Sequence, residues 1–298
     1  MTDGIVASAG LFFASVAIGL LAASFSNRKD KQPPNRKASD FMPFTFSHPA
    51  IVLPLRRLGW VSFPALVFGS MAPDFEYFLR MQPCSVYSHT LLGLFCVDLP
   101  LVIVLYVLYR YIVEKGLLAV LPLWAAKGLA SGRPQTRSRR RTWVSLVVFA
   151  YSALLGSYSH IAWDAFTHDG GSMVERFAFL QQRIPLLFLD VPVYKLLQHG
   201  STLLGGLAIA FVLWRTGRKN DHVEIKQATL YGKGLFWLGV AVIGLGVVVW
   251  HAFFVKGVSP LIHPLQQVVP FLSGSLLGIC LLAPLANRPG LKKKGRFA

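Results

Sequence analysis

Side chains of the types that bind metals are spaced four residues apart in the segment SHIAWDAFTHDGG, residues 159–171. His160, Asp164 and His168 occupy positions i, i+4 and i+8. At about 100° per residue, three such side chains lie within a stripe roughly 80° wide on one face of an α-helix. They could therefore converge on a single cation. The competing interpretation is a histidine pair that ends a buried helix by hydrogen bonding to loop carbonyls.

The chain has only eight histidines, and several of the others also stand beside an apolar segment. His48 lies in MPFTFSHPA, His89 in SHTLLG and His199 in VPVYKLLQHGST, while Asp74 follows Ala-Pro in GSMAPDFEY. An aspartate at the end of an apolar run is also typical of a helix N-cap. Together with His160 and Asp164, however, Asp74 and His89 would make a set of two imidazoles and two carboxylates. Such a set suits Zn²⁺ or another divalent ion.

The amino-acid composition indicates whether these residues belong to a soluble protein or to a membrane protein. Of the 298 residues, 54% are hydrophobic and 14% are charged, which is too apolar for a soluble domain of this length. Apolar runs, most of them near the ~20 residues that a spanning helix needs, recur along the chain. They cover residues 5–25, 91–113, 143–158, 201–214, 234–255 and 265–285. The sequence predicts an all-α polytopic membrane helix bundle with about six to seven spanning helices.

A weaker apolar run at residues 58–72 is broken by Pro64 and would be about 22 Å long as a helix. We interpret it as a half-span or a buried helix. His48 and Asp74 flank this run, so they could not share a metal if the run crossed the membrane. Either His48 reaches into the bundle past a hairpin or tilted helix, or the basic residues at 28–37 lie outside the cell. The sequence leaves both arrangements open.

The net charge of +17 is distributed as in a membrane protein. Of the 30 Lys and Arg residues, 22 fall in the stretches 28–37, 115–141, 215–233 and 288–296. Each stretch follows or separates apolar runs, which is typical of the cytoplasmic side and its anionic lipids. No aromatic residues are interleaved as a stacking platform, so nucleic acid is not an expected partner. We expect a multi-pass protein of the inner (plasma) membrane with a cytoplasmic C-terminus and with residues 159–199 on the outer side.

The segments MPFTFSHPA, GSMAPDFEY, SHTLLG, GSYSHIAWDAFTHDGG and VPVYKLLQHGST resemble, in wording and order, the motifs of a bacterial membrane family. That family is close to the YdjM-like membrane-bound metal-dependent hydrolases. The resemblance covers residues 42 to about 214. It implies an N-terminal membrane anchor with a basic linker at 1–41 and a hydrolase-like membrane domain at 42–215. Residues 216–298 would then form a C-terminal pair of membrane helices with a basic tail.

A more distant similarity links the chain to zinc-dependent phospholipases C and fungal zinc nucleases, which are all-α enzymes. Their metal ligands run in the order His, Asp, His, His-x3-Asp, His, His-x3-Glu. This sequence offers the same order with His48, Asp74, His89, His160, Asp164, His168 and His199. The similarity implies one metal site from Asp74, His89, His160 and Asp164, a contribution of His48 with Asp164 to another, and a further one begun by His168 and His199.

Two departures from this ligand order reduce the number of metal ions expected. Leu203 stands where the last glutamate of the order should be, and His48 is internal, so it has no free amino group to bind a metal. We therefore expect one or two ions, with Zn²⁺ first. A divalent ion with an open position lowers the pKa of bound water to about 7 and so supports attack on phosphorus. Asp164 would bridge metals, and His168 or Asp169 would move protons.

A site at the membrane surface would meet membrane lipid by lateral diffusion, which favours an amphiphilic phosphoester such as a phospholipid or a lipid-linked phosphate. Arg80, Arg176 or Arg183 could clamp its phosphate. The main alternative is a divalent-metal transporter or sensor, for which Asp98 inside the run 91–113 is the best feature. A structural membrane protein stapled by a metal is a third alternative. The sequence does not indicate the oligomeric state.

The charge distribution predicts which loops are accessible from outside the cell. In a variant with Cys84, Cys96 and Cys280 replaced by serine, Ser172→Cys should react with a membrane-impermeant thiol reagent in intact cells. Ser138→Cys lies in a basic stretch and should react only after the membrane is opened. Labelling of position 138 in intact cells, with position 172 protected, would reverse the topology.

Overall fold

The computed structural model describes residues 47–82, 85–131, 142–186, 189–254 and 267–286, and in this part the chain is almost entirely helical. The elements in chain order are α2 (Ser47–Ile51), the 3-10 turn η2 (Leu53–Arg57), α3 (Phe63–Arg80), α4 (Leu91–Gly93), the π-helical turn η3 (Leu94–Asp98), α5 (Leu99–Leu108), a second π-helical turn η4 (Tyr109–Val113), α6 (Glu114–Val120), α7 (Leu123–Ala130), α8 (Thr142–Thr167), α9 (Ser172–Arg176), α10 (Ala178–Gln181), β1 (Arg183–Leu186), β2 (Leu189–Pro192), α11 (Val193–Lys219), α12 (Leu230–Phe254) and α13 (Val268–Ala286). The two strands form one antiparallel ribbon. The prediction of an all-α membrane helix bundle is confirmed.

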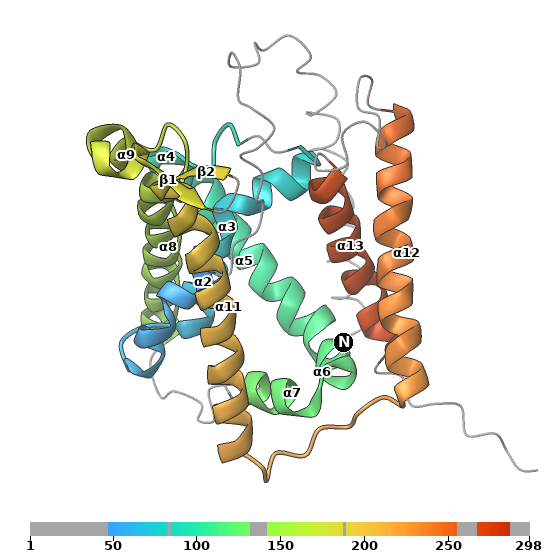
Figure 1. Ribbon diagram of the computed structural model, residues 1–298. Helices are drawn as coiled ribbons and strands as arrows, with labels where there is room; N and C mark the ends of the chain where they lie inside the picture. Colours follow the sequence, from blue (N-terminus) through green and yellow to red (C-terminus); the bar gives the residue numbers. More distant parts are fainter. Residues whose placement is uncertain (1–46, 83–84, 132–141, 187–188, 255–266, 287–298) are drawn as a thin grey trace, which may run out of the picture.

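Five helical stretches in the described residues are long and apolar enough to cross a membrane. They are Leu91–Val120, Trp143–Arg176, Val193–Lys219, Leu230–Phe254 and Val268–Ala286. Each overlaps one of the apolar runs seen in the sequence, and the remaining run, residues 5–25, lies outside the described residues. Figure 1 shows α8 and α11 on one side of the bundle, α12 and α13 on the other, and α5 between them.

The weaker run at 58–72 forms part of α3, which is not among the candidate spans. Pro64 lies in the first turn of this helix, where its missing N–H would have no helical partner in any case. Pro64 therefore marks the start of α3, and residues 58–62 of the run precede the helix. The helix continues through Pro73 and ends only at Met81, which takes the left-handed conformation with φ 52°. Half of its 18 residues are buried, in agreement with the buried-helix interpretation.

α3 and α8 approach each other closely because glycines face each other across the contact. A Cβ on Gly69 would lie 2.2 Å from a backbone oxygen of α8, and a Cβ on Gly156 would lie 2.3 Å from a backbone oxygen of α3. Pro73 has no N–H to donate to the Gly69 carbonyl, and Ser157 Oγ donates to this oxygen instead, at 3.1 Å. The two helices that carry most of the candidate ligands are thus held backbone to backbone.

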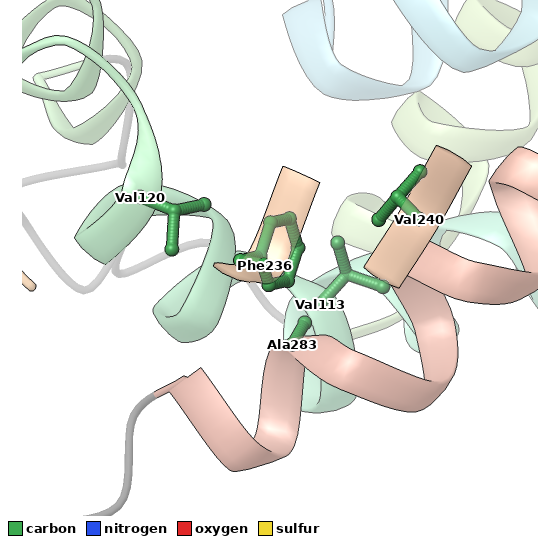
Figure 2. Close-up of a cluster of buried hydrophobic side chains, with 5 residues drawn as sticks. All are labelled: Val113, Val120, Phe236, Val240 and Ala283. Carbon is green, nitrogen blue, oxygen red and sulfur yellow. The ribbon is translucent and has the colours of Figure 1, made fainter. Parts of the chain in front are cut away.

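The C-terminal helices α12 and α13 pack on each other and against the lower half of the first span. Figure 2 shows the buried side chains where these three segments meet: Val113, Val120, Phe236, Val240 and Ala283. Ser273 Oγ of α13 also donates to the Phe78 carbonyl of α3, at 2.9 Å. The C-terminal pair is therefore connected to the helix that carries Asp74, and the division of the chain at residue 215 stays a prediction.

The α3–α8 contact predicts a difference between two glycine substitutions. Gly156→Ala should lower the midpoint of thermal unfolding in detergent, because overpacking costs about 1–3 kcal/mol. Gly200→Ala in α11 adds the same methyl where no atom lies within 4 Å, and it should be neutral or stabilising by up to about 1 kcal/mol. Circular dichroism during heating measures both midpoints. Equal midpoints would contradict the close contact.

Candidate metal centre

The candidate ligands come together where α2, the last third of α3, the start of the first span and the end of α8 meet. Figure 1 shows the end of α8 and the start of α4 at the upper end of the bundle, beside α9. α2 contacts α3, α8 and α11, so its His48 reaches into the bundle. The difficulty with His48 and Asp74 is thereby resolved, since His48 Nε2 lies 3.4 Å from Asp164 Oδ1 and Asp74 Oδ1 lies 3.5 Å from His160 Nε2 of the same helix.

The Nε2 atoms of His89 and His160 both face the carboxylates of Asp74 and Asp164. His160 Nε2 lies 3.5 Å from Asp74 Oδ1 and 3.2 Å from Asp164 Oδ2. His89 Nε2 lies 4.0 Å from the same oxygen of Asp74 and 3.5 Å from the same oxygen of Asp164. Two imidazoles and two carboxylates from three separate parts of the chain thus lie close together, and side chains of these types can hold a divalent cation.

The second oxygen of Asp164 faces a different pair of histidines. His48 Nε2 lies 3.4 Å from Asp164 Oδ1, and His168 Nδ1 lies 3.3 Å from it. The His48 ring also stacks on His160, with centroids 3.7 Å apart. Asp164 thus stands between two groups of nitrogen atoms and offers one oxygen to each.

Several polar atoms of this cluster are buried and have no hydrogen-bond partner among the described residues. They are His48 Nδ1, His89 Nε2, His160 Nε2 and Asp164 Oδ1. Leaving a buried donor or acceptor unpaired costs about 1–3 kcal/mol each. Ligand atoms of His48, His160 and Asp164, and those of Asp74, His89 and His160, also lie within 4.8 Å of one another. Such a concentration of unpaired atoms fits a bound divalent cation.

The other ring nitrogen of two histidines is occupied, which determines the atom that a cation could bind. His160 Nδ1 lies 2.8 Å from the Ser70 carbonyl and donates to it. His89 Nδ1 lies 3.2 Å from Ser88 Oγ, whose hydroxyl donates to the Pro73 carbonyl at 2.8 Å and so accepts from the ring. Outer contacts of this kind fix the tautomer of metal-binding histidines. Nε2 of both rings is left for the cation.

His48 is neutral near pH 7. Burial lowers its pKa well below the ordinary value, the neighbouring His160 lowers it further, and Asp164 opposes both effects. Neutral imidazole is the form that binds metals. His48 can therefore serve as a ligand without first losing a proton.

Glu76 pairs with Arg80 at i, i+4, but its side chain is buried and it holds the loop before His89. Its carboxylate accepts hydrogen bonds from the backbone N–H groups of Val86, Tyr87 and Ser88 at 2.9–3.1 Å and from Arg80 Nε at 2.8 Å. Burial alone would raise the pKa of Glu76, but the hydrogen bonds to its charged form lower it overall. Sequence reasoning missed this role because the donors are backbone groups.

The motif SHTLLG connects this loop to the first span. Thr90 is the N-cap of α4, and its hydroxyl accepts from the Gly93 N–H at 2.9 Å. A Cβ on Gly93 would lie 1.9 Å from the Tyr87 carbonyl oxygen, so the turn requires glycine. The spanning helix therefore begins immediately after His89, which fixes this ligand at the helix end.

His199 does not join the cluster, so the expected further site with His168 is absent from the described residues. The His199 side chain is exposed on α11. Gln198 is buried instead, with its Nε2 3.0 Å from His168 Nε2. Adjacent helical residues point about 100° apart, so the inward position of Gln198 turns His199 outward. Asp169 is exposed in a turn before Gly170, whose φ is 71°.

The three arginines considered as phosphate clamps differ in position. Arg80 is paired with Glu76, and its guanidinium lies 5.7 Å from the centre of the Tyr87 ring. Arg176 ends α9 and Arg183 begins β1, and both are exposed. Only Arg80 is held by a residue next to the cluster.

The fold and the cluster define a helical membrane protein with a candidate divalent-metal centre at one end of its bundle. The family model of DUF4184, a domain of unknown function, matches residues 42–283. The chain therefore belongs to the DUF4184 family. The matched region begins where the motif resemblance begins but extends through α12 and most of α13. Neither the curated proteins nor the solved structures contain a match to the chain.

The Glu76 contacts predict that this residue controls metal affinity without binding the metal. Glu76→Gln should weaken Zn²⁺ binding by about 10–100-fold, because loss of an outer contact misplaces His89. Glu175→Gln on exposed α9 is the matched control and should leave affinity unchanged. Competition with a chromophoric chelator measures both. Equal affinities in the two variants would contradict the positioning role.

The same residue predicts an acid dependence of stability. The pKa of Glu76 in the folded protein lies below its ordinary value of 4.5. Its stabilising contribution is therefore complete above that value and lost as the pH falls below it towards the folded pKa. The unfolding midpoint of the wild type should thus approach that of Glu76→Gln as the solution is acidified below about pH 4.5.

Proposed function

We propose that this protein is a membrane-embedded metal-dependent hydrolase that cleaves a phosphoester carried by an amphiphilic molecule. One observation carries the proposal. Nε2 of His89 and Nε2 of His160 are buried, have no hydrogen bond among the described residues, and face the carboxylates of Asp74 and Asp164.

The contacts suggest how the chain would hold one or two ions, with Zn²⁺ first. Asp74, His89, His160 and one oxygen of Asp164 would hold the first. His48 and the other oxygen of Asp164 would contribute to a second, with His168 beside them. His160 can serve only one ion because its Nδ1 is bonded to Ser70. Asp164, which offers one oxygen to each group of histidines, is therefore the residue that could help to hold both ions.

A bound ion with an open position would lower the pKa of a water molecule to about 7. Hydrolysis would add a water molecule across one P–O ester bond: its oxygen would bond to phosphorus, the ester bond would break, and the departing alcohol oxygen would take a proton. His168 is placed to move that proton, since its Nδ1 lies 3.3 Å from Asp164 Oδ1 and its ring is the most exposed of the cluster, at 33%. Gln198 holds the far side of the ring.

The exposure of the ligands supports a reactive centre over a structural staple. His48 and His160 are 3% and 0% exposed, whereas His89 and His168 are 22% and 33% exposed. The cluster thus combines two buried ligands with two whose rings are partly exposed. A metal that only cross-linked helices would need no exposed ligands.

The position of the cluster supports an amphiphilic substrate. His89 precedes the span Leu91–Val120 by two residues, and His168 directly follows α8, in the C-terminal part of the candidate span Trp143–Arg176. Ligands at the ends of spanning helices lie near the level of lipid head groups. The motif resemblance to membrane-bound metal-dependent hydrolases and the ligand order of zinc phospholipases C favour the same substrate class.

A divalent-metal transporter is the second candidate, and Asp98 is the observation that favours it. Asp98 is fully buried inside the first span, and neither carboxylate oxygen has a hydrogen-bond partner among the described residues. Ionisable residues inside a membrane often mark ion pathways. Against this candidate, the ligand cluster lies at helix ends, whereas transport sites usually lie near the bilayer midplane.

Removing a ligand should abolish hydrolysis without preventing insertion. His160→Ala and Asp164→Asn should lose bound metal and metal-dependent phosphoester hydrolysis, because either change removes an atom that would hold the ion. His199→Ala is the matched control: it removes an exposed histidine outside the cluster and should leave activity within a fewfold. Metal content and turnover are compared at matched membrane expression.

Unchanged turnover in both ligand variants would end the hydrolase proposal. Transport is tested in parallel with Asp98→Asn in proteoliposomes loaded with a zinc-sensitive dye. Metal uptake by the wild type that is lost in this variant, without hydrolysis of any phospholipid or lipid-linked phosphate tested, would favour the transporter instead.

A further inference from the structure

The surface beside His89 is strongly apolar. Val86 and Tyr87 precede this ligand and are 49% and 55% exposed, while Leu91, Leu92 and Phe95 follow it and are 67%, 73% and 59% exposed. We call these five residues the apolar lip. Exposed apolar side chains so close to a polar cluster indicate that something apolar lies against them.

The lip is continuous with a surface that faces the membrane interior. Leu91, Leu92 and Phe95 open the span Leu91–Val120, and spacings of three and four residues place Phe95 beside both leucines on one helix face. Further along this span Ile103 and Tyr111 are also exposed. Lipid tails that contact the span can therefore approach His89 without crossing a polar barrier.

The loop half of the lip is held in place. Glu76 accepts the N–H groups of Val86 and Tyr87, and the guanidinium of Arg80 lies over the Tyr87 ring. This places the Arg80 guanidinium, which is paired with Glu76, beside the lip. The side of the cluster near His168 is different, since polar Gln198 borders it and α9 packs against α8. The cluster thus has an apolar side at His89 and a polar side at His168.

We propose that an amphiphilic substrate reaches the metal centre sideways from the bilayer, with its acyl chains against the apolar lip and its phosphate between Arg80 and the cluster. This inference rests on the proposed hydrolase function and adds the direction of access and the residues that select a long-chain substrate. Water and the released head group use the His168 side. The occupant of the lip is an acyl chain of the substrate.

The first test compares a lipid with a soluble phosphodiester. Leu92→Ser/Phe95→Ser should raise the KM for dioleoyl phosphatidylglycerol in mixed micelles about tenfold or more, because lost apolar contact weakens binding of the chains. Turnover of bis(p-nitrophenyl) phosphate should not change. Leu238→Ser/Leu245→Ser, on an exposed face of α12, is the matched control and should alter neither. Leu92→Ala/Phe95→Ala replaces the serine variant if that variant fails to insert.

The second test does not depend on turnover. A phosphatidylglycerol with a diazirine near the end of one acyl chain should cross-link to residues 86–95 more strongly in the Zn²⁺-loaded protein than after chelation. Cross-linking to α12 should not depend on the metal, since bulk lipid contacts that helix.

The outcomes separate the two proposals. The inference is overturned if the lip variant alters hydrolysis of both substrates equally or of neither. It is also overturned if cross-linking at the lip is the same with and without Zn²⁺. A wild-type protein that binds Zn²⁺ but hydrolyses neither substrate counts against the hydrolase function. Metal-dependent cross-linking at the lip would in that case still support lipid binding there.

Discussion

The close contact between α3 and α8 is the constraint on which the candidate metal centre depends. Gly69 and Gly156 remove the side chains that would separate the backbones. Pro73 leaves the Gly69 carbonyl without a helical donor, and α8 supplies one from Ser157. One residue further along α3, the Ser70 carbonyl receives His160 Nδ1, which turns Nε2 of that ring towards Asp74. The proline that would weaken an isolated helix therefore helps to join two helices, and the joint sets the direction of a ligand.

A second constraint comes from the two carboxylates of α3, which perform different tasks two residues apart. Asp74 faces the histidines, whereas Glu76 accepts hydrogen bonds from the backbone N–H groups of the loop before His89. Burying a charged carboxylate is costly unless hydrogen bonds satisfy it, and the loop satisfies Glu76. The same loop leads through Thr90 into the first span. The position of His89 is thus determined from both sides, by a buried carboxylate before it and by a helix cap after it.

Sequence reasoning identified the helical class and the spanning runs because apolar length and charge distribution are local properties of the chain. The spacing of His160, Asp164 and His168 likewise indicated one helix face. Other features depend on contacts between distant segments. No local signal shows that α3 continues through Pro73, since the compensating donor lies on α8. No local signal distinguishes Gln198 from His199 either, because the rotation of α11 about its axis is set by its packing. The metal itself, its identity and the hydrolysis of a phosphoester stay predictions.

The exposure of the ligands connects this geometry to the membrane. His160, at the centre of the cluster, is fully buried, and exposure rises outward to His89 and His168. These two histidines border different surroundings: the apolar start of a spanning helix on one side, and a polar turn with Gln198 on the other. A reaction that joins water to a lipid-borne ester needs access from both phases at one point. A cluster placed at the ends of spanning helices meets that requirement, whereas one at the bilayer midplane would have to admit water through the bundle.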